Sequence, residues 1–167
     1  MRVGFGYDSH RFAGAVSPDG GGFPPCQRLG GVEVPGRPRL KGHSDADVLL
    51  HAVTDALLGA AALGDIGSHF PDTDPRWRGA DSALMLKAVV GEIADAGFAV
   101  GNVDVTVVCE RPKIRPHVEA IRERIASILG IRPSCVSVKG KTNEGMDAVG
   151  EGLGIVAYAV ALVEDVA

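Results

Sequence analysis

Acidic and imidazole side chains recur at helical spacing in the stretch HSDADVLLHAVTDALLGAAAL, which covers residues 43–63. Asp47, His51 and Asp55 are four residues apart, so on a helix they share one face. Apolar residues such as Leu49 and Val53 fall on the other side. The acidic face has no Lys or Arg, whereas a solvated helix face usually mixes both signs. The pattern therefore indicates half of a metal site or of an acid–base site.

The other half of such a site lies near the N-terminus. Residues 2–10 are predicted to form a strand that leads into a loop, and Asp8 and His10 would then point the same way. With His51 they offer three nitrogen and oxygen ligands, which leaves one position of a tetrahedral zinc ion open, as in catalytic zinc sites. The same spacing also fits two ordinary, partly buried histidines, so both interpretations stay open.

The elements that must position these side chains follow from local patterns. Ser44 is predicted as the N-cap of a helix that continues to Leu63, with Asp47 as the acid of a variant capping box. Further helices are expected over 82–96 and 116–129, strands over 30–34, 103–109, 136–141 and 154–163, and surface loops over 13–29 and 64–75.

These elements predict an α+β fold in one domain over residues 1–167, because strands and helices mix without strict alternation. We expect a mixed sheet of four to five strands with helices on one face. The uninterrupted apolar and small residues of 154–163 predict a strand that is covered on both faces, on one side by other subunits.

Composition limits the class of protein. A hydrophobic content of 46% in 167 residues predicts a folded domain, and a net charge of −4 gives no basic footprint for nucleic acid. Three scattered cysteines without a C-x-x-C pair favour a reducing compartment. No apolar run is long enough to cross a membrane, and the N-terminus leaves no room for a signal peptide before the first strand. We therefore expect a cytoplasmic protein without membrane contact.

Eight short segments, in this order and at close to the family spacing, resemble the 2-C-methyl-D-erythritol 2,4-cyclodiphosphate synthases of the non-mevalonate isoprenoid pathway. They are Asp8-Ser9-His10, His43-Ser44-Asp45-Ala46-Asp47, Leu57-Leu58-Gly59-Ala60, Gly64-Asp65-Ile66-Gly67, Phe70-Pro71-Asp72-Thr73-Asp74-Pro75, Gly101-Asn102-Val103-Asp104-Val105-Thr106, Arg111-Pro112-Lys113 and the stretch from Lys139 to Glu144. The resemblance covers essentially the whole chain. It implies a homotrimer around a three-fold axis, with active sites between neighbouring subunits.

The resemblance also implies a reaction and its metal ions. The substrate, 4-diphosphocytidyl-2-C-methyl-D-erythritol 2-phosphate, is a nucleotide whose 2-phosphate attacks the β-phosphorus while CMP leaves. The nucleophile belongs to the substrate, so positioning and electrostatics are the tasks of the protein. One zinc ion per subunit is implied on Asp8, His10 and His51, and Mg²⁺ or Mn²⁺ near Glu144 is implied with the substrate diphosphate.

Specific residues carry the implied roles. His43 and Thr142 are the implied catalytic residues, and His43 and Ser44 would present an anion site at a helix N-terminus. The implied substrate-binding residues are Ser9, Ser44, Asp65, Ile66, Gly67, Phe70, Asp72, Cys109, Pro112, Lys113, Ile114, Arg115, Lys141 and Asn143. Asp65 and Asp72 would accept hydrogen bonds from methylerythritol hydroxyls, and residues 109–115 would receive the cytidine. Asp55 is either a partner of a histidine nitrogen or a solvent-facing helix acid.

Two stretches depart from the family pattern. Many members have three threonines before the glutamate, where this chain has Lys141-Thr142-Asn143-Glu144, so a hypothesis is that Lys141 binds phosphate instead. Many also have Gly-Arg-Gly-Glu, where this chain has Gly150-Glu151-Gly152-Leu153. An acid in place of that arginine predicts that an axial cavity would not hold an anionic isoprenoid.

Two other functions remain open from the residues alone. One is a metal-dependent phosphohydrolase in which zinc activates water. The other is a non-catalytic trimeric module with structural zinc, although structural zinc usually has four protein ligands, often with cysteines among them.

Overall fold

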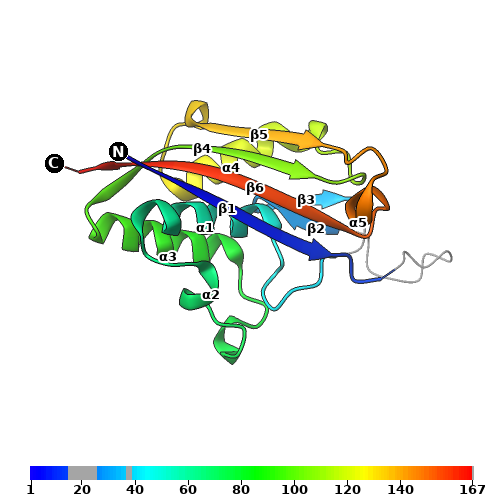
Figure 1. The fold of residues 1–167 in the computed structure, drawn as a ribbon, viewed down its shortest axis with the longest axis horizontal. Coiled ribbons are helices and arrows are strands. Elements are labelled where there is room, and N and C mark those ends of the chain that lie inside the picture. The colour runs from blue at the N-terminus through cyan, green and yellow to red at the C-terminus, as the bar shows by residue number, and fades with distance from the viewer. Residues whose placement is uncertain (15–25, 37–38, 167) are drawn as a thin grey trace.

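A four-stranded mixed sheet forms the centre of the fold in a computed structural model that describes residues 1–14, 26–36 and 39–166. Its strands lie in the order β1 (Arg2–Arg11), β6 (Gly154–Asp165), β4 (Phe98–Val108) and β5 (Val136–Lys141). β6 is antiparallel to both of its neighbours, and β4 and β5 are parallel (Figure 1). β1 and β5 are therefore the two opposite edges of the sheet.

The helices α1 (Val48–Ala61), α3 (Ser82–Asp95) and α4 (Val118–Leu129) lie on one face of this sheet (Figure 1). Val103, Val105 and Val107 of β4 are fully buried, as their alternation with polar residues predicts. The α+β class and the helices on one face are thus confirmed. None of the helices in the described part of the chain is both long and apolar enough to cross a bilayer.

Short elements complete the fold. They are the hairpin of β2 (Cys26–Leu29) and β3 (Val32–Pro35), the helices α2 (Ile66–His69) and α5 (Asp147–Gly150), and 3-10 turns at Pro75–Trp77, Arg115–His117 and Pro133–Cys135. The predicted surface loop over 13–29 is wrong at its end, where β2 pairs with β3, and residues 15–25 of it lie outside the described residues. β4 also begins at Phe98, five positions before the predicted strand, because its first part pairs with the end of β6.

The N-cap of α1 is Asp47 and not Ser44. The Asp47 carboxylate accepts hydrogen bonds from the backbone N–H groups of Leu50 at 3.1 Å, Gly30 at 2.8 Å and Gly31 at 2.6 Å. Asp47 is fully buried and stands at the N-cap, before the first helical residue, so it does not share one helix face with His51 as predicted. The side chain that caps the helix also fixes the turn between β2 and β3.

Gly4 and Gly6 determine how closely α1 approaches β1. A Cβ atom at Gly4 would lie 1.9 Å from the carbonyl oxygen of Ala56, and one at Gly6 would lie 1.9 Å from that of Ala52. No side chain fits between these backbones, so the helix rests directly on the strand. The contact places the first turns of α1 over the end of β1, where the predicted metal ligands are.

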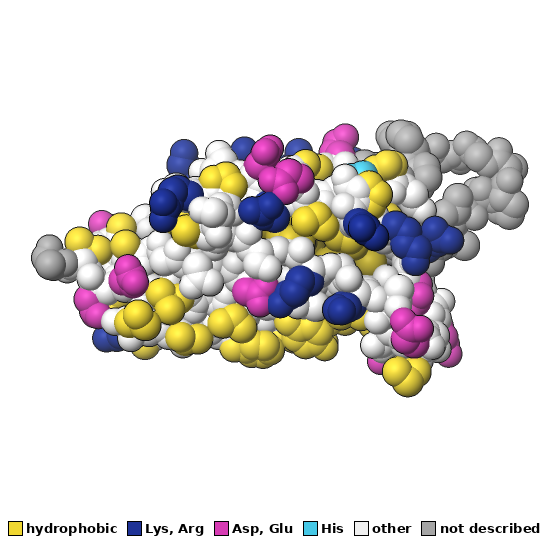
Figure 2. Space-filling view, turned by 90° about the horizontal axis from the view of Figure 1, so that it is seen from above, with side chains coloured by type: hydrophobic (Ala, Val, Ile, Leu, Met, Phe, Trp, Pro, Cys, Tyr) yellow, Lys and Arg dark blue, Asp and Glu magenta, His cyan; other side chains and the backbone are white. Residues whose placement is uncertain are grey.

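The other face of the sheet is open and apolar. Phe5 and Val3 of β1 are each 63% exposed, and Tyr158 and Val160 of β6 are 40% and 42% exposed. Hydrophobic side chains follow one side of the molecule in the view of Figure 2. The single chain leaves this face of β6 uncovered, and the predicted cover by other subunits stays a prediction.

We expect Gly6→Ala to destabilise the fold by about 3 kcal/mol, because the added methyl group meets helix backbone that cannot rotate away. Gly91→Ala is the matched control, since Gly91 is an exposed position of α3 with no atom near its Cβ. This control should gain up to about 1 kcal/mol from helix propensity. Urea unfolding followed by circular dichroism measures both. Equal midpoints for Gly6→Ala and the wild type would contradict the close contact.

Candidate metal centre and active site

Asp8, His10 and His51 bring three ligand atoms together. Asp8 Oδ2 lies 3.0 Å from His10 Nε2 and 2.9 Å from His51 Nδ1. His10 Nε2 and His51 Nδ1 are 3.2 Å apart. Asp8 and His10 point the same way from β1, as predicted, and His51 faces them from the first turn of α1. The structure thus brings the three predicted ligands to one point.

This triangle fits a divalent metal ion. Around tetrahedral zinc, with bonds of about 2.0–2.1 Å, ligand atoms are about 3.3 Å apart. The three atoms of the chain are 2.9–3.2 Å apart, slightly closer than that. One carboxylate and two imidazoles are also a ligand set that zinc accepts.

Hydrogen bonds hold the outer nitrogens of both histidines. His10 Nδ1 lies 2.7 Å from the carbonyl oxygen of Lys41, which can only accept, so Nδ1 donates and Nε2 is left for a metal ion. His51 Nε2 lies 2.9 Å from Ser82 Oγ and 3.1 Å from Ser44 Oγ. Such outer partners orient metal-binding histidines.

The charges of the centre depend on burial and on these contacts. Burial disfavours the ionised form of Asp8, but hydrogen bonds from His10 and His51 outweigh it and hold the pKa of Asp8 well below 3.8. Burial also disfavours the charged form of His10, yet the hydrogen bond and the charge of Asp8 raise the pKa of His10 above 6.5. The lowered pKa of Asp8 and the raised pKa of His10 both favour an ion pair between these two side chains when no metal ion is bound.

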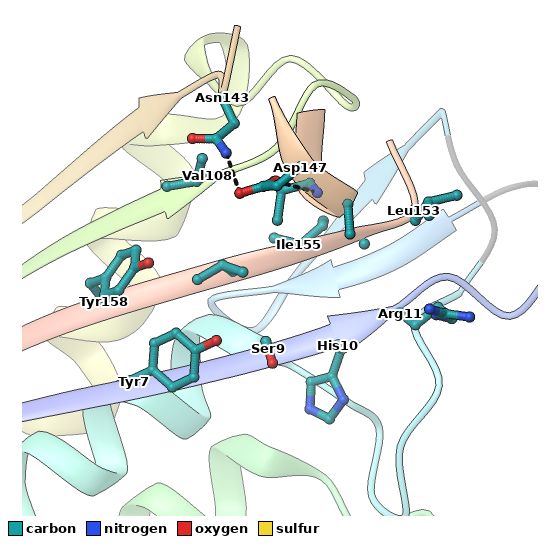
Figure 3. Close-up of a pocket in the computed structure, with 14 residues that line it drawn as sticks. Tyr7, Ser9, His10, Arg11, Val108, Asn143, Asp147, Leu153, Ile155 and Tyr158 are labelled. Carbon is teal, nitrogen blue, oxygen red and sulfur yellow. Dashed lines mark hydrogen bonds between the residues drawn. The ribbon is translucent and has the colours of Figure 1, made fainter. Parts of the chain in front are cut away.

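A cavity of about 510 Å³ opens beside this centre. It is lined by Asp8, His10, His43, Ser44, His51, Ile66, Gly67, Phe70, Pro71, Asp72, Trp77 and Met85. The structure therefore brings most of the first-half site residues predicted from the resemblance to the metal centre. Ser9 is separate, because it points away from its neighbours on β1 and lines a cavity of about 700 Å³ at the open face (Figure 3).

Two of the predicted acids have structural partners near this cavity. Asp65 caps α2, accepting hydrogen bonds from the N–H of Ser68 at 2.8 Å and from its hydroxyl at 2.7 Å. Asp55 Oδ1 accepts from the N–H of Ile66 at 2.8 Å, so α1 positions α2 directly. Asp55 was predicted either to contact a histidine nitrogen or to face solvent, and neither prediction describes this hydrogen bond to the α2 backbone.

The anion site expected at His43 and Ser44 does not form as predicted. α1 begins four residues after Ser44, and the Asp47 side chain occupies a first-turn N–H group. Ser44 instead places its hydroxyl 3.1 Å from His51 Nε2. The two side chains still line the cavity, but without the helix N-terminus behind them.

A second cavity of about 240 Å³ lies where β4 and β5 end. It is lined by Cys109, Pro112, Lys113, Ile114, Arg115, Val118, Gly140, Lys141 and Thr142. These include all five residues predicted in the cytidine loop. Burial raises the pKa of Cys109 to about 11, so its thiol stays protonated and offers no nucleophile at neutral pH.

The turn after β5 holds the remaining predicted residues. The Thr142 hydroxyl donates to Glu144 Oε1 at 2.5 Å, and the Asn143 side chain donates to Asp147 Oδ2 at 2.8 Å (Figure 3). Glu144 is exposed and adopts a left-handed backbone conformation with φ of 51°. The turn therefore presents the Glu144 carboxylate to solvent.

The two cavities lie at opposite edges of the sheet. The metal ligands come from β1 and the helix above it, whereas the second cavity follows β4 and β5. Three strand spacings of about 4.8 Å separate β1 from β5, or about 14 Å. Within one chain, the structure therefore does not bring Thr142, Glu144 or residues 109–115 to the metal centre.

Several site residues were not predicted from the sequence. Trp77 and Met85 line the metal cavity, and Ser82 and Asp45 form a hydrogen-bonded pair behind His51. Asp45 belongs to the acid-rich stretch, which was a usable signal. Ser82 gave no signal beyond its place after the Asp81 N-cap, since its approach to His51 depends on how α3 packs on α1.

We expect zinc affinity and the stability of the metal-free protein to change with pH in opposite directions. The raised pKa of His10 means that its pairing with Asp8 stabilises the fold fully below pH 6.5 and is lost as pH rises through the folded-state pKa. The lowered pKa of Asp8 means that the stabilisation from this ionised carboxylate is lost only as pH falls below about 3.8. Zinc needs neutral histidine, so its apparent affinity should fall by up to about tenfold per pH unit from pH 8 to 6.

The stability difference between metal-free wild type and His10→Ala measures the first trend, and chelator competition measures the second. His10→Ala should remove the stability trend. Zinc affinity that is constant from pH 6 to 8 would contradict a centre built on these histidines.

Comparisons with known proteins place the chain in a family. The model of the YgbB family matches residues 1–164. The 2-C-methyl-D-erythritol 2,4-cyclodiphosphate synthase of Symbiobacterium thermophilum is 56% identical over 163 residues, which are 98% of each chain.

Solved structures of similar proteins agree with this family assignment. The bifunctional IspDF of Campylobacter jejuni is 34% identical with a TM-score of 0.88, over 98% of this chain and 42% of that longer chain. The IspF of Plasmodium falciparum, in a complex with CDP, is 32% identical with a TM-score of 0.84, over 99% of this chain and 97% of the other. The chain is therefore an enzyme, and it belongs to the YgbB family of 2-C-methyl-D-erythritol 2,4-cyclodiphosphate synthases.

Proposed function

We propose that this enzyme converts 4-diphosphocytidyl-2-C-methyl-D-erythritol 2-phosphate into 2-C-methyl-D-erythritol 2,4-cyclodiphosphate and releases CMP, as a step of isoprenoid precursor synthesis. An oxygen of the 2-phosphate forms a bond to the β-phosphorus. The bond from that phosphorus to the bridging oxygen breaks, and CMP takes its electron pair. The names of the relatives support this reaction, and family membership sets aside the non-catalytic alternative.

The chemistry of the two cavities supports the proposal. The metal cavity offers a carboxylate, two imidazoles and the apolar surfaces of Phe70 and Ile66, which suit a polyol with a phosphate. The second cavity has the cationic Lys113, Arg115 and Lys141 around an apolar floor, which suits a nucleotide. The bound CDP of the Plasmodium falciparum relative agrees with a nucleotide substrate.

Each metal ion would have its own residues. Zinc held by Asp8, His10 and His51 would supply Lewis-acid polarisation of a phosphate oxygen. Mg²⁺ or Mn²⁺ would take Glu144 as its protein ligand, because magnesium favours few carboxylates together with substrate phosphates. The exposed position of Glu144 on its turn suits that task.

The chain's own residues would orient the substrate. Asp72, with Gly67 and Phe70, would hold the methylerythritol part, and Asp65 would act mainly by capping α2. His43, Ser44 and Thr142 would donate hydrogen bonds to phosphate oxygens as charge develops there. Ser9, Asn143 and Ile114 stay proposals for contacts in the assembled site.

The observation that carries the proposal is the separation of the two cavities at opposite edges of one sheet. A complete site requires the β1 edge of one chain to meet the β5 edge of another. An interface of this kind is head-to-tail, and it forms a ring when the rotation between neighbouring chains closes. The open apolar face of Val3, Phe5 and Tyr158 is the surface that such a ring would bury. The family resemblance supplies the number three, and we place the homotrimer in the cytoplasm.

We expect incubation with the diphosphocytidyl substrate to give CMP and the cyclic diphosphate in equal amounts. Phosphorus NMR and mass spectrometry identify both. Activity should be lost on chelation and return with zinc and magnesium together, because the two ions have separate ligands. Release of inorganic phosphate with a linear product would instead identify the phosphohydrolase alternative.

We also expect two inactive variants to complement each other. His51→Ala removes a metal ligand, and Lys113→Ala removes a cation of the second cavity. When equal amounts of the two chains assemble at random, about one interface in four pairs two intact halves, so about a quarter of wild-type activity should return. Lys87→Ala, an exposed lysine of α3, is the control and should stay active alone. No recovery in mixed trimers verified by native mass spectrometry would indicate a site within one chain.

A further inference from the structure

Behind His51, on the side away from the other metal ligands, lies a short chain of polar side chains. His51 Nε2 is 2.9 Å from Ser82 Oγ. The Ser82 hydroxyl in turn contacts Asp45 Oδ1, and the Ser82 backbone N–H donates to Asp45 Oδ2 at 3.2 Å. Ser82 is only 1% exposed, so water does not replace these partners.

The direction of each hydrogen bond in this chain is fixed. A carboxylate only accepts hydrogen bonds, so the single hydrogen of the Ser82 hydroxyl goes to Asp45. The oxygen of that hydroxyl can then only accept from His51 Nε2. His51 therefore carries a hydrogen on Nε2, and with a metal ion bound its Nδ1 would offer its lone pair to that ion. In the metal-free chain, Asp8 Oδ2 lies 2.9 Å from Nδ1 and competes for a hydrogen there.

The Arg28 guanidinium lies beside the aspartate. Arg28 Nη1 of β2 lies 3.7 Å from Asp45 Oδ2 and 3.1 Å from Asp81 Oδ2. Asp81 is the N-cap of α3, and Ser82 is the first residue of that helix. Arg28 thus joins Asp45 to Asp81, which directly precedes Ser82 in the sequence.

Ser44 also faces His51 Nε2 but is differently held. Its oxygen is 3.1 Å away and accepts a weak hydrogen bond from the N–H of Ala46 at 3.3 Å, while its hydrogen has no fixed acceptor among the described residues. Ser44 lines the metal cavity, whereas Ser82 does not. The two serines therefore have different roles. Ser82 orients the imidazole of His51, whereas the Ser44 hydroxyl is free to turn toward a bound phosphate.

We propose that Asp45 and Ser82 are positioning residues of the metal centre, which set the tautomer and ring orientation of His51 so that Nδ1 binds the metal ion. This inference rests on the metal centre of the proposed function but not on its substrate. Outer partners of metal-binding histidines typically change metal affinity by about 10–100-fold when they are removed.

Zinc affinity, measured by chelator competition without substrate, tests the proposal. Ser82→Ala should lower it by about 10–100-fold and alter the visible spectrum of the Co²⁺-substituted protein. Thr54→Ala is the matched control, since Thr54 is a buried α1 hydroxyl that donates to the Leu50 carbonyl at 2.7 Å and does not line the metal cavity. It should lose stability but keep its zinc affinity within about twofold.

Asp45→Asn separates the role of the carboxylate from that of the serine. An amide at this position can donate to the Ser82 oxygen, which turns the serine hydrogen toward His51 and favours the wrong tautomer. In metal-free protein at pH 8, long-range ¹H–¹⁵N spectra report how the hydrogen of His51 divides between Nε2, facing Ser82, and Nδ1, facing Asp8. The share on Nε2 should be smaller in this variant than in the wild type.

The outcomes are decisive for each residue. Wild-type zinc affinity and Co²⁺ spectrum in folded Ser82→Ala would overturn the role of the serine, and an unchanged His51 tautomer in Asp45→Asn would overturn that of the aspartate. Because no substrate is used, these results are independent of whether the product assay supports the cyclisation.

Discussion

The direct contact between α1 and β1 is the constraint on which the site depends. Two of the three ligands come from the strand and one from the helix, and their ligand atoms are about 3 Å apart. Side chains as short as Asp and His reach one point only if the two backbones touch. Gly4 and Gly6 allow this, because any Cβ atom there would collide with helix carbonyls. The metal site is thus determined by glycines that carry no chemistry of their own.

The same contact also explains why the site is incomplete in one chain. β1 is an edge strand, so the helix that covers it leaves the site open toward whatever lies beyond that edge. The cations and the Glu144 turn are at the other edge, beyond β6 and β4. A sheet of this width cannot fold its own edges together, whereas in the proposed assembly a second copy would present the missing edge. Under that proposal, the strand order links assembly to catalysis.

How much the sequence predicts depends on whether a feature is local. The direction of Asp8 and His10 follows from strand alternation, and the helix after Asp81 follows from its cap. The predicted start of α1 was wrong because Ser44 and Asp47 are both favourable N-cap residues. The choice between them is made by the N–H groups of the turn at residues 30–31, which reach only Asp47. Ser82 was missed for the same kind of reason, since only the packing of α3 on α1 brings it to His51.

The distribution of charge gives each half of the site a separate task. The metal cavity has Asp8 and Asp72 on its walls, with Asp45 behind it, so without a cation it would repel a phosphorylated substrate. A bound divalent ion reverses the local sign, and the low pKa of Asp8 keeps that ligand ionised at any physiological pH. The second cavity is already cationic through Lys113 and Arg115. Under the proposed function, an anionic nucleotide would dock there first, and the acidic half would add affinity only with a metal ion bound.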